Sequence, residues 1–131
     1  MNKYTELSDF EINLAVAHIV LGKDNYDWCP DKKEVYLAGI DGGDFLPHGY
    51  FDPCNKPADA MPIIKDNFIS ITYDGIAWDV SCAKYPKLSV WNGLENYNDN
   101  FYRKAMELFL LMKDAENNNE TSSSNDNASI N

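Results

Sequence analysis

The sequence has no hydrophobic run that could cross a membrane, and it has little positive charge. Its longest apolar run, Leu108–Met112, is far shorter than the roughly 20 residues of a membrane-spanning helix. The 131 residues include 11 basic and 21 acidic ones, which gives a formal net charge of −10. Because the apolar run is so short, we expect no membrane insertion. Because so acidic a chain repels phosphate backbones, we expect no direct nucleic-acid binding. An acidic mimic of DNA is a weaker alternative, since the acids are scattered rather than arranged in rows.

Cysteine and histidine are also scarce. The 3 cysteines, Cys29, Cys54 and Cys82, are widely spaced and form no CxxC motif. The N-terminal sequence lacks the basic and apolar segments of a signal peptide, so we expect reduced thiols in a cytoplasmic protein. His48 and the cysteines would be plausible metal ligands, but their spacing matches no compact zinc motif, and buried structural thiols are favoured. We therefore predict no metal and no cofactor.

A nucleophilic pair of Cys54 and His48 has equally little support, because the sequence shows no third residue to orient it and no oxyanion site. We predict no catalytic residue.

The composition supports a single folded domain followed by a polar tail. Hydrophobic residues make up 44% of the chain and aromatic residues 13%, which is enough for a core. The composition changes after Ala115, where the sequence NNNETSSSNDNASIN contains Ile130 as its one large apolar residue. We predict a globular domain over residues 1–116 and a disordered tail over residues 117–131.

Two long amphipathic helices are expected near the ends of the domain. Ser8-x-x-Glu11 is a capping box that begins a helix over residues 8–21, and Gly22 is a typical stop. A second apolar stripe predicts a helix over residues 99–115, capped by Asn98 or Asp99. On that helix Arg103 and Glu107 stand four residues apart, and we expect a weak ion pair between them on its wetter side.

The clearest pattern in the chain is a β-hairpin. Residues 68–73 and 76–82 alternate apolar and polar, and Asp74-Gly75 between them is a type I′ turn signal. This turn would place Tyr73 opposite Ile76, Ile71 opposite Trp78 and Ile69 opposite Val80.

Weaker signals complete the architecture. They predict a strand over residues 34–38, a third strand around 88–91 and a short helix over 57–66 that contains Pro62. Residues 25–33 and 39–50 are assigned to loops. The fold class is therefore α+β: a small antiparallel sheet of about three strands, built on the hairpin and packed by the two terminal helices like an α-β-α sandwich.

The best candidate for specialised chemistry is the stretch Phe51–Ile64, FDPCNKPADAMPII. Asp52, Asn55 and Asp59 surround a helix start, where they are ordinarily capping and turn residues. The functional alternative is the polar rim of a ligand pocket, for example for a nucleotide phosphate, if Arg103 or a lysine offsets the acids. We name Asp52, Asn55, Asp59, Arg103 and Trp91 as candidate ligand-binding residues.

Several aromatic residues lie in predicted loops. They either cluster to stack a base or bind a partner, or lie scattered at the edges of the core, which we favour. These residues are Tyr50, Tyr85, Trp91 and Tyr97.

Four segments follow one another along the chain: LSDFEIN (Leu7–Asn13), Phe51–Ile64, the hairpin ISITYDGIAW and YRKAMELFLLM (Tyr102–Met112). In these segments the chain resembles the NinX-like family of small proteins from lambdoid-type phages and prophages of enteric bacteria. The resemblance spans about residues 5–115, and Met61 stands where relatives tend to carry tryptophan. A weaker similarity links the chain to phage α-β-α sandwich domains.

The resemblance implies a phage or prophage accessory protein in the cytoplasm of the bacterial host, and it supplies no activity. We favour a non-enzymatic binding module for a small molecule or a host protein, with counter-defence as one setting. The alternatives are a small hydrolase or nucleotide-processing enzyme that uses Asp52 and Asp59, and the DNA mimic. The sequence is also compatible with a homo-oligomer.

Overall fold

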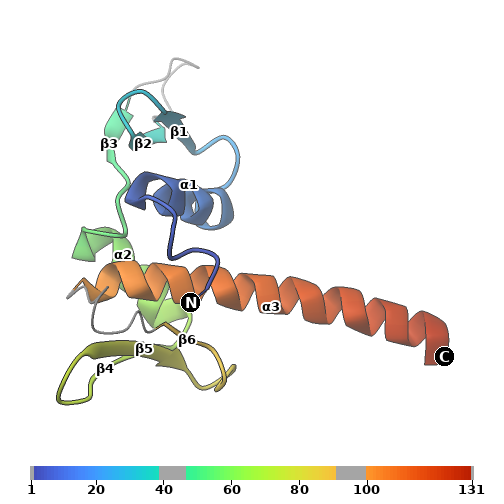
Figure 1. The fold of residues 1–131 in the computed structure, drawn as a ribbon. Coiled ribbons are helices and arrows are strands. Elements are labelled where there is room, and N and C mark those ends of the chain that lie inside the picture. Colours follow the sequence, from blue (N-terminus) through green and yellow to red (C-terminus); the bar gives the residue numbers. More distant parts are fainter. Residues whose placement is uncertain (1, 39–46, 91–99, 131) are drawn as a thin grey trace.

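In the computed structural model, two small antiparallel sheets lie on opposite sides of a layer of helices (Figure 1). The structure describes residues 2–38, 47–90 and 100–130. One sheet has the order β1-β2-β3 and the other the order β4-β5-β6. Along the chain the elements are α1 (Asp9–Val20), β1 (Tyr26–Cys29), β2 (Glu34–Ala38), β3 (Pro47–Tyr50), α2 (Pro57–Asp66), β4 (Ile69–Tyr73), β5 (Trp78–Cys82), β6 (Ser89–Val90) and α3 (Phe101–Ile130).

The α+β class with a helix near each end is confirmed, but the layering differs from the expected sandwich. The helix α1 packs on α3 and on the β1-β2-β3 sheet, whereas α3 packs on the β4-β5-β6 sheet. The first sheet was not expected, because β1 and β3 fall in segments assigned to loops. Strands of four residues are too short to show a clear alternation, and pairing with β2 from both sides is what orders them.

The local helix signals predict α1 and α2 correctly. The N–H of Glu11 donates to Ser8 Oγ over 3.1 Å, and the N–H of Ser8 donates back to Glu11 Oε1 over 3.0 Å. Gly22, just after α1, has φ +87°, a conformation that glycine adopts without strain. The helix α2 has the predicted bounds and contains Pro62, and β2 and β6 lie within the predicted strands.

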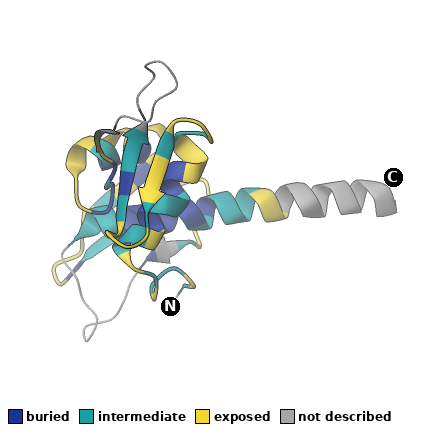
Figure 2. Cartoon of the chain, turned by 90° about the horizontal axis from the view of Figure 1, so that it is seen from above, coloured by how far each residue is buried: buried dark blue, intermediate teal, exposed yellow. Residues whose placement is uncertain are grey.

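The helix α3 is the centre of the core. Its segment from Lys104 to Leu110 is buried on every side, because α1, α2 and the β4-β5-β6 sheet surround it (Figure 2). Asn100 caps its start by accepting a bond from the N–H of Arg103 over 3.2 Å, while the predicted caps at 98 and 99 lie outside the described residues. The helix extends to Ile130, beyond the predicted 99–115. The disorder predicted for 117–131 stays a prediction. Among the described residues, no helix is long and apolar enough to cross a membrane.

The hairpin is present, but its predicted register is wrong by two residues. Tyr73 pairs with Trp78, Ile71 with Val80 and Ile69 with Cys82. The turn centres on Gly75 and Ile76, because the Asp74 carboxylate accepts the N–H groups of Ile76 at 2.8 Å and of Ala77 at 2.9 Å. A shift of two residues keeps the paired side chains of β4 and β5 on their predicted faces, so the alternation could not exclude it. Ile76, in contrast, moves from the predicted strand into the turn.

The turn position can be tested by two substitutions. Gly75 has φ +102°, so Gly75→Ala should lower the free energy of unfolding by about 1 kcal/mol. Ile76→Ala should be nearly neutral, because Ile76 is 70% exposed. Urea unfolding measures both values. A loss of about 2 kcal/mol or more for Ile76→Ala would support the register expected from the sequence, in which Ile76 faces the core.

Candidate functional site

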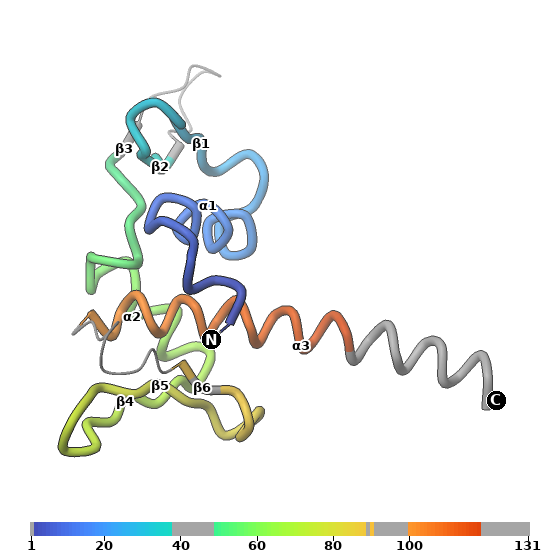
Figure 3. The backbone as a smooth tube through the Cα atoms, in the orientation of Figure 1, coloured from blue at the N-terminus to red at the C-terminus, as the bar shows by residue number. Residues whose placement is uncertain are grey.

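The Phe51–Lys56 segment is fastened to α1 by one buried amide. Asn13, which is 6% exposed, donates from Nδ2 to the Asp52 carboxylate over 2.7 Å, and its Oδ1 accepts the N–H of Cys54 over 3.1 Å. The chain from β3 to α2 passes the side of α1 and reaches the start of α3 (Figure 3). The segment is therefore held where three elements meet.

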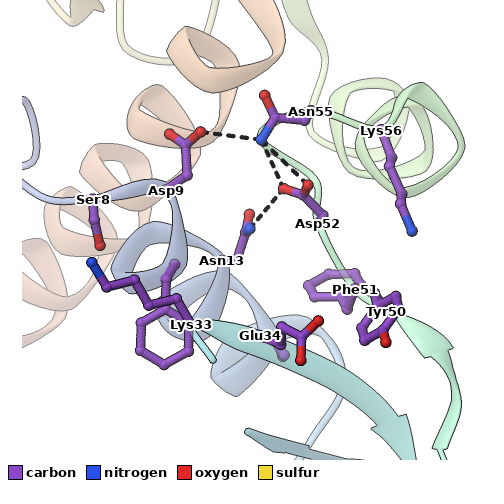
Figure 4. A pocket seen from close by; sticks show the side chains of 12 residues that line it. Ser8, Asp9, Asn13, Lys33, Glu34, Tyr50, Phe51, Asp52, Asn55 and Lys56 are labelled. Carbon is purple, nitrogen blue, oxygen red and sulfur yellow. Dashed lines mark hydrogen bonds between the residues drawn. The ribbon is translucent and has the colours of Figure 1, made fainter. Parts of the chain in front are cut away.

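Asn55 and Asn100 extend this hydrogen-bond network to α3. The Asn55 Nδ2 donates to Asp52 Oδ1 and to Asp9 Oδ2, each over 3.1 Å (Figure 4). The Asn100 Nδ2 donates to Asn55 Oδ1 over 3.0 Å and to the carbonyl oxygen of Cys54 over 2.7 Å. The Asn55 amide therefore bridges the carboxylates of Asp9 and Asp52 through hydrogen bonds.

Arg103 is bound to the other side of Asp9. Its Nη1 lies 2.7 Å from Asp9 Oδ1, and its Nε lies 2.8 Å from Glu107 Oε2. Its Nη2 donates to the carbonyl oxygens of Tyr4 and Leu7 over 2.9 and 2.7 Å. The predicted ion pair between Arg103 and Glu107 is present, but its predicted place on the wetter side of the helix is wrong. The two side chains are only 11% and 2% exposed. The N-terminal lead-in covers them, which the helical spacing alone could not show.

Glu107 is satisfied by that same lead-in. Its Oε1 accepts from Asn2 Nδ2 over 3.2 Å and from Thr5 Oγ1 over 3.3 Å. Nearby, the hydroxyl of Tyr4 donates to Asp114 over 2.6 Å, and burial together with this carboxylate raises the pKa of Tyr4. These bonds hold residues 2–7 against α3.

A pocket of about 480 Å³ opens between this network and the β1-β2-β3 sheet. Its volume lies in the range of small-molecule sites. One wall carries the acids and amides of the network, and the opposite wall carries aromatic residues (Figure 4). The lining residues are Ser8, Asp9, Phe10, Asn13, Lys33, Glu34, Val35, Tyr50, Phe51, Asp52, Asn55 and Lys56.

Two exposed lysines stand at this pocket. Lys33 has φ +56°, an unusual conformation for a residue with a side chain, in the turn between β1 and β2. The Nζ of Lys56 lies 5.6 Å from the centre of the Tyr50 ring. The Tyr36 hydroxyl donates to Glu34 over 2.7 Å, and this bond raises the pKa of Tyr36 to about 12. Within the described residues, neither lysine forms a salt bridge.

The structure brings some of the candidate residues together. Asp52 and Asn55 line the pocket, and Arg103 lies behind it, bound to Asp9. Asp59 does not line it; its carboxylate accepts the N–H of Asp52 over 2.9 Å, which is a turn-stabilising role. Trp91 lies outside the described residues. Their roles in binding stay predictions.

The sequence reasoning did not select several pocket residues. Asp9 and Asn13 were seen as parts of the first helix, although both belong to the LSDFEIN segment that carries the family resemblance. The family resemblance of this segment was the signal that could have indicated Asp9 and Asn13 as site residues. Lys33 and Tyr50 come from regions assigned to loops. Tyr50 was considered as a loop aromatic that could stack a base, and nothing local to Lys33 indicates a pocket.

The cysteines do not form a site in the described part of the chain. Cys54 and Cys82 are buried and Cys29 is partly exposed, all as free thiols. Burial raises the pKa of the Cys54 thiol, which disfavours the reactive thiolate. The described residues contain no group of three potential metal ligands. The side chain of His48 is outside the described set.

The loop aromatics that the structure describes lie apart. Tyr50 lines the pocket, whereas Tyr85 lines a separate hollow beside Leu88 and Ala115. Trp91 and Tyr97 fall outside the described residues, so clustering among all four stays untested.

Together, the fold and the pocket define a small acidic α+β protein with a polar, aromatic-walled cavity beside a buried ion network. The family described as Bacteriophage P22, NinX matches residues 3–113, so the chain belongs to this phage family. The match confirms the resemblance seen in the sequence, and membership suggests a phage accessory protein. Comparisons with curated proteins and with solved structures found no match.

The buried ion network makes a testable contribution to stability. Arg103→Met should lower the free energy of unfolding by about 3–5 kcal/mol, because it leaves Glu107 buried and unpaired. The double variant Arg103→Met/Glu107→Leu should lose less than the single variant, since the buried carboxylate is removed together with its partner. Urea unfolding of Arg103→Met, Glu107→Leu and the double variant gives all three losses. Losses that simply add would contradict the coupling.

Thiol reactivity tests whether Cys54 and Cys82 are buried, unreactive thiols. In the native protein at pH 8, an aromatic disulfide reagent should modify Cys29 rapidly, and should reach Cys54 and Cys82 only after denaturation. Absorbance of the released thiolate counts the reactive groups. Cys29→Ser, as the matched control, should abolish the fast phase, and fast modification of Cys54 would reopen the nucleophile hypothesis.

Proposed function

We propose that this phage accessory protein is a non-enzymatic binding module for a small anionic ligand of the nucleotide class. The observation that supports this most is the 480 Å³ pocket itself, which combines a fixed carboxylate, aromatic side chains and two lysines that form no salt bridge within the described residues. Each of these groups suits one part of a nucleotide.

The formal charge around the pocket is less negative than that of the whole chain, which favours an anionic ligand at this place. The pocket lining carries Asp9, Glu34 and Asp52 against Lys33 and Lys56, and Arg103 behind it is shared between Asp9 and the buried Glu107. These three cations and four acids leave a formal charge of −1 around the pocket, whereas the formal net charge of the whole chain is −10. The two lysines can donate to phosphate oxygens without first breaking a salt bridge.

The uncharged parts of a nucleotide also find partners. A carboxylate accepts hydrogen bonds from ribose hydroxyls, and Asp52 is held in place for this by Asn13 and Asn55. Phe10, Tyr50 and Phe51 supply aromatic surface on which a base can pack. Because three elements hold these groups, ligand binding needs little rearrangement.

The hydrolase alternative has less support. It requires Asp52 and Asp59 to act together, but Asp59 bonds to the backbone of Asp52 and does not line the pocket. A counter-defence setting, such as sequestering a nucleotide signal, rests on the phage family alone.

Thermal-shift measurements test the proposal. Nucleoside mono-, di- and triphosphates, nucleosides and inorganic phosphate are each added to the full chain. A bound nucleotide should raise the melting temperature by about 3 °C or more at saturation, and the nucleoside alone should do less. Divalent metal chlorides, added alone, should leave it unchanged.

Matched variants locate the effect. Lys33→Asn, which tolerates the positive φ, should weaken nucleotide binding about tenfold without a loss of stability. Lys65→Gln removes an exposed lysine that does not line the pocket, and it should bind like the wild type. Flat responses to every nucleotide, or equal effects of the two variants, would sink the proposal.

A further inference from the structure

Phe68 is an aromatic residue whose backbone conformation and solvent exposure are both unfavourable for the stability of the fold. It directly follows Asn67, the C-cap of α2, and has φ +55°. Helices that end in this left-handed conformation usually carry glycine or asparagine there, because a Cβ is crowded. Phe68 is also 81% exposed, the highest value among the exposed large hydrophobic residues described.

The fold therefore gains little from this side chain. The backbone is strained, and the ring contributes little buried area in return. Strained and exposed aromatic residues are typical of contacts with another molecule rather than of cores. Phe68 thus points to a surface, and the strand that follows it shows which kind.

The strand β4 is an edge of its sheet. It pairs with β5 on one side and has no strand partner on the other among the described residues. Edge strands are commonly protected by charged residues, proline or bulges. The segment from Phe68 to Tyr73 contains no charged residue and no proline, and its pairing with β5 is regular.

The hydrogen-bond pattern shows which backbone groups face the open side. The N–H of Asp74 donates to the carbonyl oxygen of Ala77 over 3.1 Å, so residues 74 and 77 form a bonded pair. Because bonded pairs alternate in antiparallel strands, Thr72 and Ser70 bond to β5 as well. The N–H and C=O groups of residues 69, 71 and 73 therefore point away from β5, at the spacing that an added strand requires.

From this edge we infer an interaction surface that takes an extended segment of a partner protein as an additional strand. Backbone bonds would form at residues 69, 71 and 73, with Phe68 as the aromatic anchor at one end. Tyr73, 52% exposed, and Ile76, 70% exposed, offer apolar contacts at the other end. The β4-β5-β6 sheet lies across the helix layer from the β1-β2-β3 sheet (Figure 1). The edge shares no residue with the pocket lining, so this surface is independent of the proposed ligand.

The charges around the edge define the partner further. Asp74 stands exposed at one end of the uncharged segment, and Lys65 and Asp66 stand exposed at the other. Asp74 and the net charge of −10 complement an apolar segment that carries a basic residue at the end next to Asp74. A second copy of this chain fits less well, because two molecules of net charge −10 would repel each other.

Hydrogen exchange of the free chain tests whether the edge is open. The amides of residues 69, 71 and 73 should exchange fast, and those of residues 70 and 72 slowly. Slow exchange at all five positions in a monomeric chain would show that the edge is covered and would overturn the proposal. Protection of residues 69, 71 and 73 that rises with protein concentration, together with a dimer in solution, would replace the partner by a second copy.

A labelled peptide, KVTVTVK, is the binding probe. It should bind the full chain and protect the amides of residues 69, 71 and 73, whereas EVTVTVE should bind at least about tenfold more weakly. Phe68→Gly should lower the affinity for KVTVTVK about tenfold and raise the melting temperature, because glycine relieves the positive φ. If Phe68 only supported the fold, its replacement would not lower the affinity for the peptide while raising the melting temperature.

Met61→Ala is the matched control, since Met61 is 45% exposed on α2 but lies outside the edge. It should leave the affinity unchanged. Equal binding of the two peptides, protection elsewhere in the chain, or equal losses for Phe68→Gly and Met61→Ala would each contradict an interaction at β4.

Discussion

The arrangement depends on one guanidinium, that of Arg103, whose side chain is only 11% exposed. Arg103 holds two carboxylates and two backbone carbonyl oxygens, which belong to the N-terminal lead-in, the start of α1 and α3 itself. A buried charge is tolerated only when its partners surround it, so these segments must meet at one place. Asp9 is thereby turned toward Asn55, and the position of the pocket wall follows from the position of Arg103.

Two surfaces result on opposite sides of the helix layer. The pocket is concave and carries both acids and lysines, and Asp52 in it is fixed by hydrogen bonds from Asn13 and Asn55. The β4 edge is extended and uncharged, and it carries the strained Phe68. Because they share no residue, a ligand and a partner strand would not compete. An accessory protein of this size would then join two binding events on one helical core.

The successes and failures of sequence reasoning here have separate physical causes. The bounds of α2 and the capping box of α1 follow from contacts within a few residues, and both were predictable. The hairpin faces were predictable because the alternation has a period of two, but the register was not. Shifting the turn from Asp74-Gly75 to Gly75-Ile76 keeps the faces, and the bonds to the Asp74 side chain decided between the two. Asp52 and Asn55, which were named from the sequence, line the pocket, and their role in binding stays a prediction; Lys33, which also lines it, was not named.

By itself, the sequence determined the α+β class, the helices, the faces of the hairpin strands and the phage family, because each is written in neighbouring residues or in a contiguous motif. Only the tertiary structure decided the second sheet, the burial of Arg103 with Glu107, and the pocket. Those features join residues from the N-terminus, the middle and the C-terminal helix. Periodicity reports which side of an element is buried, but it does not report which distant segment covers that side.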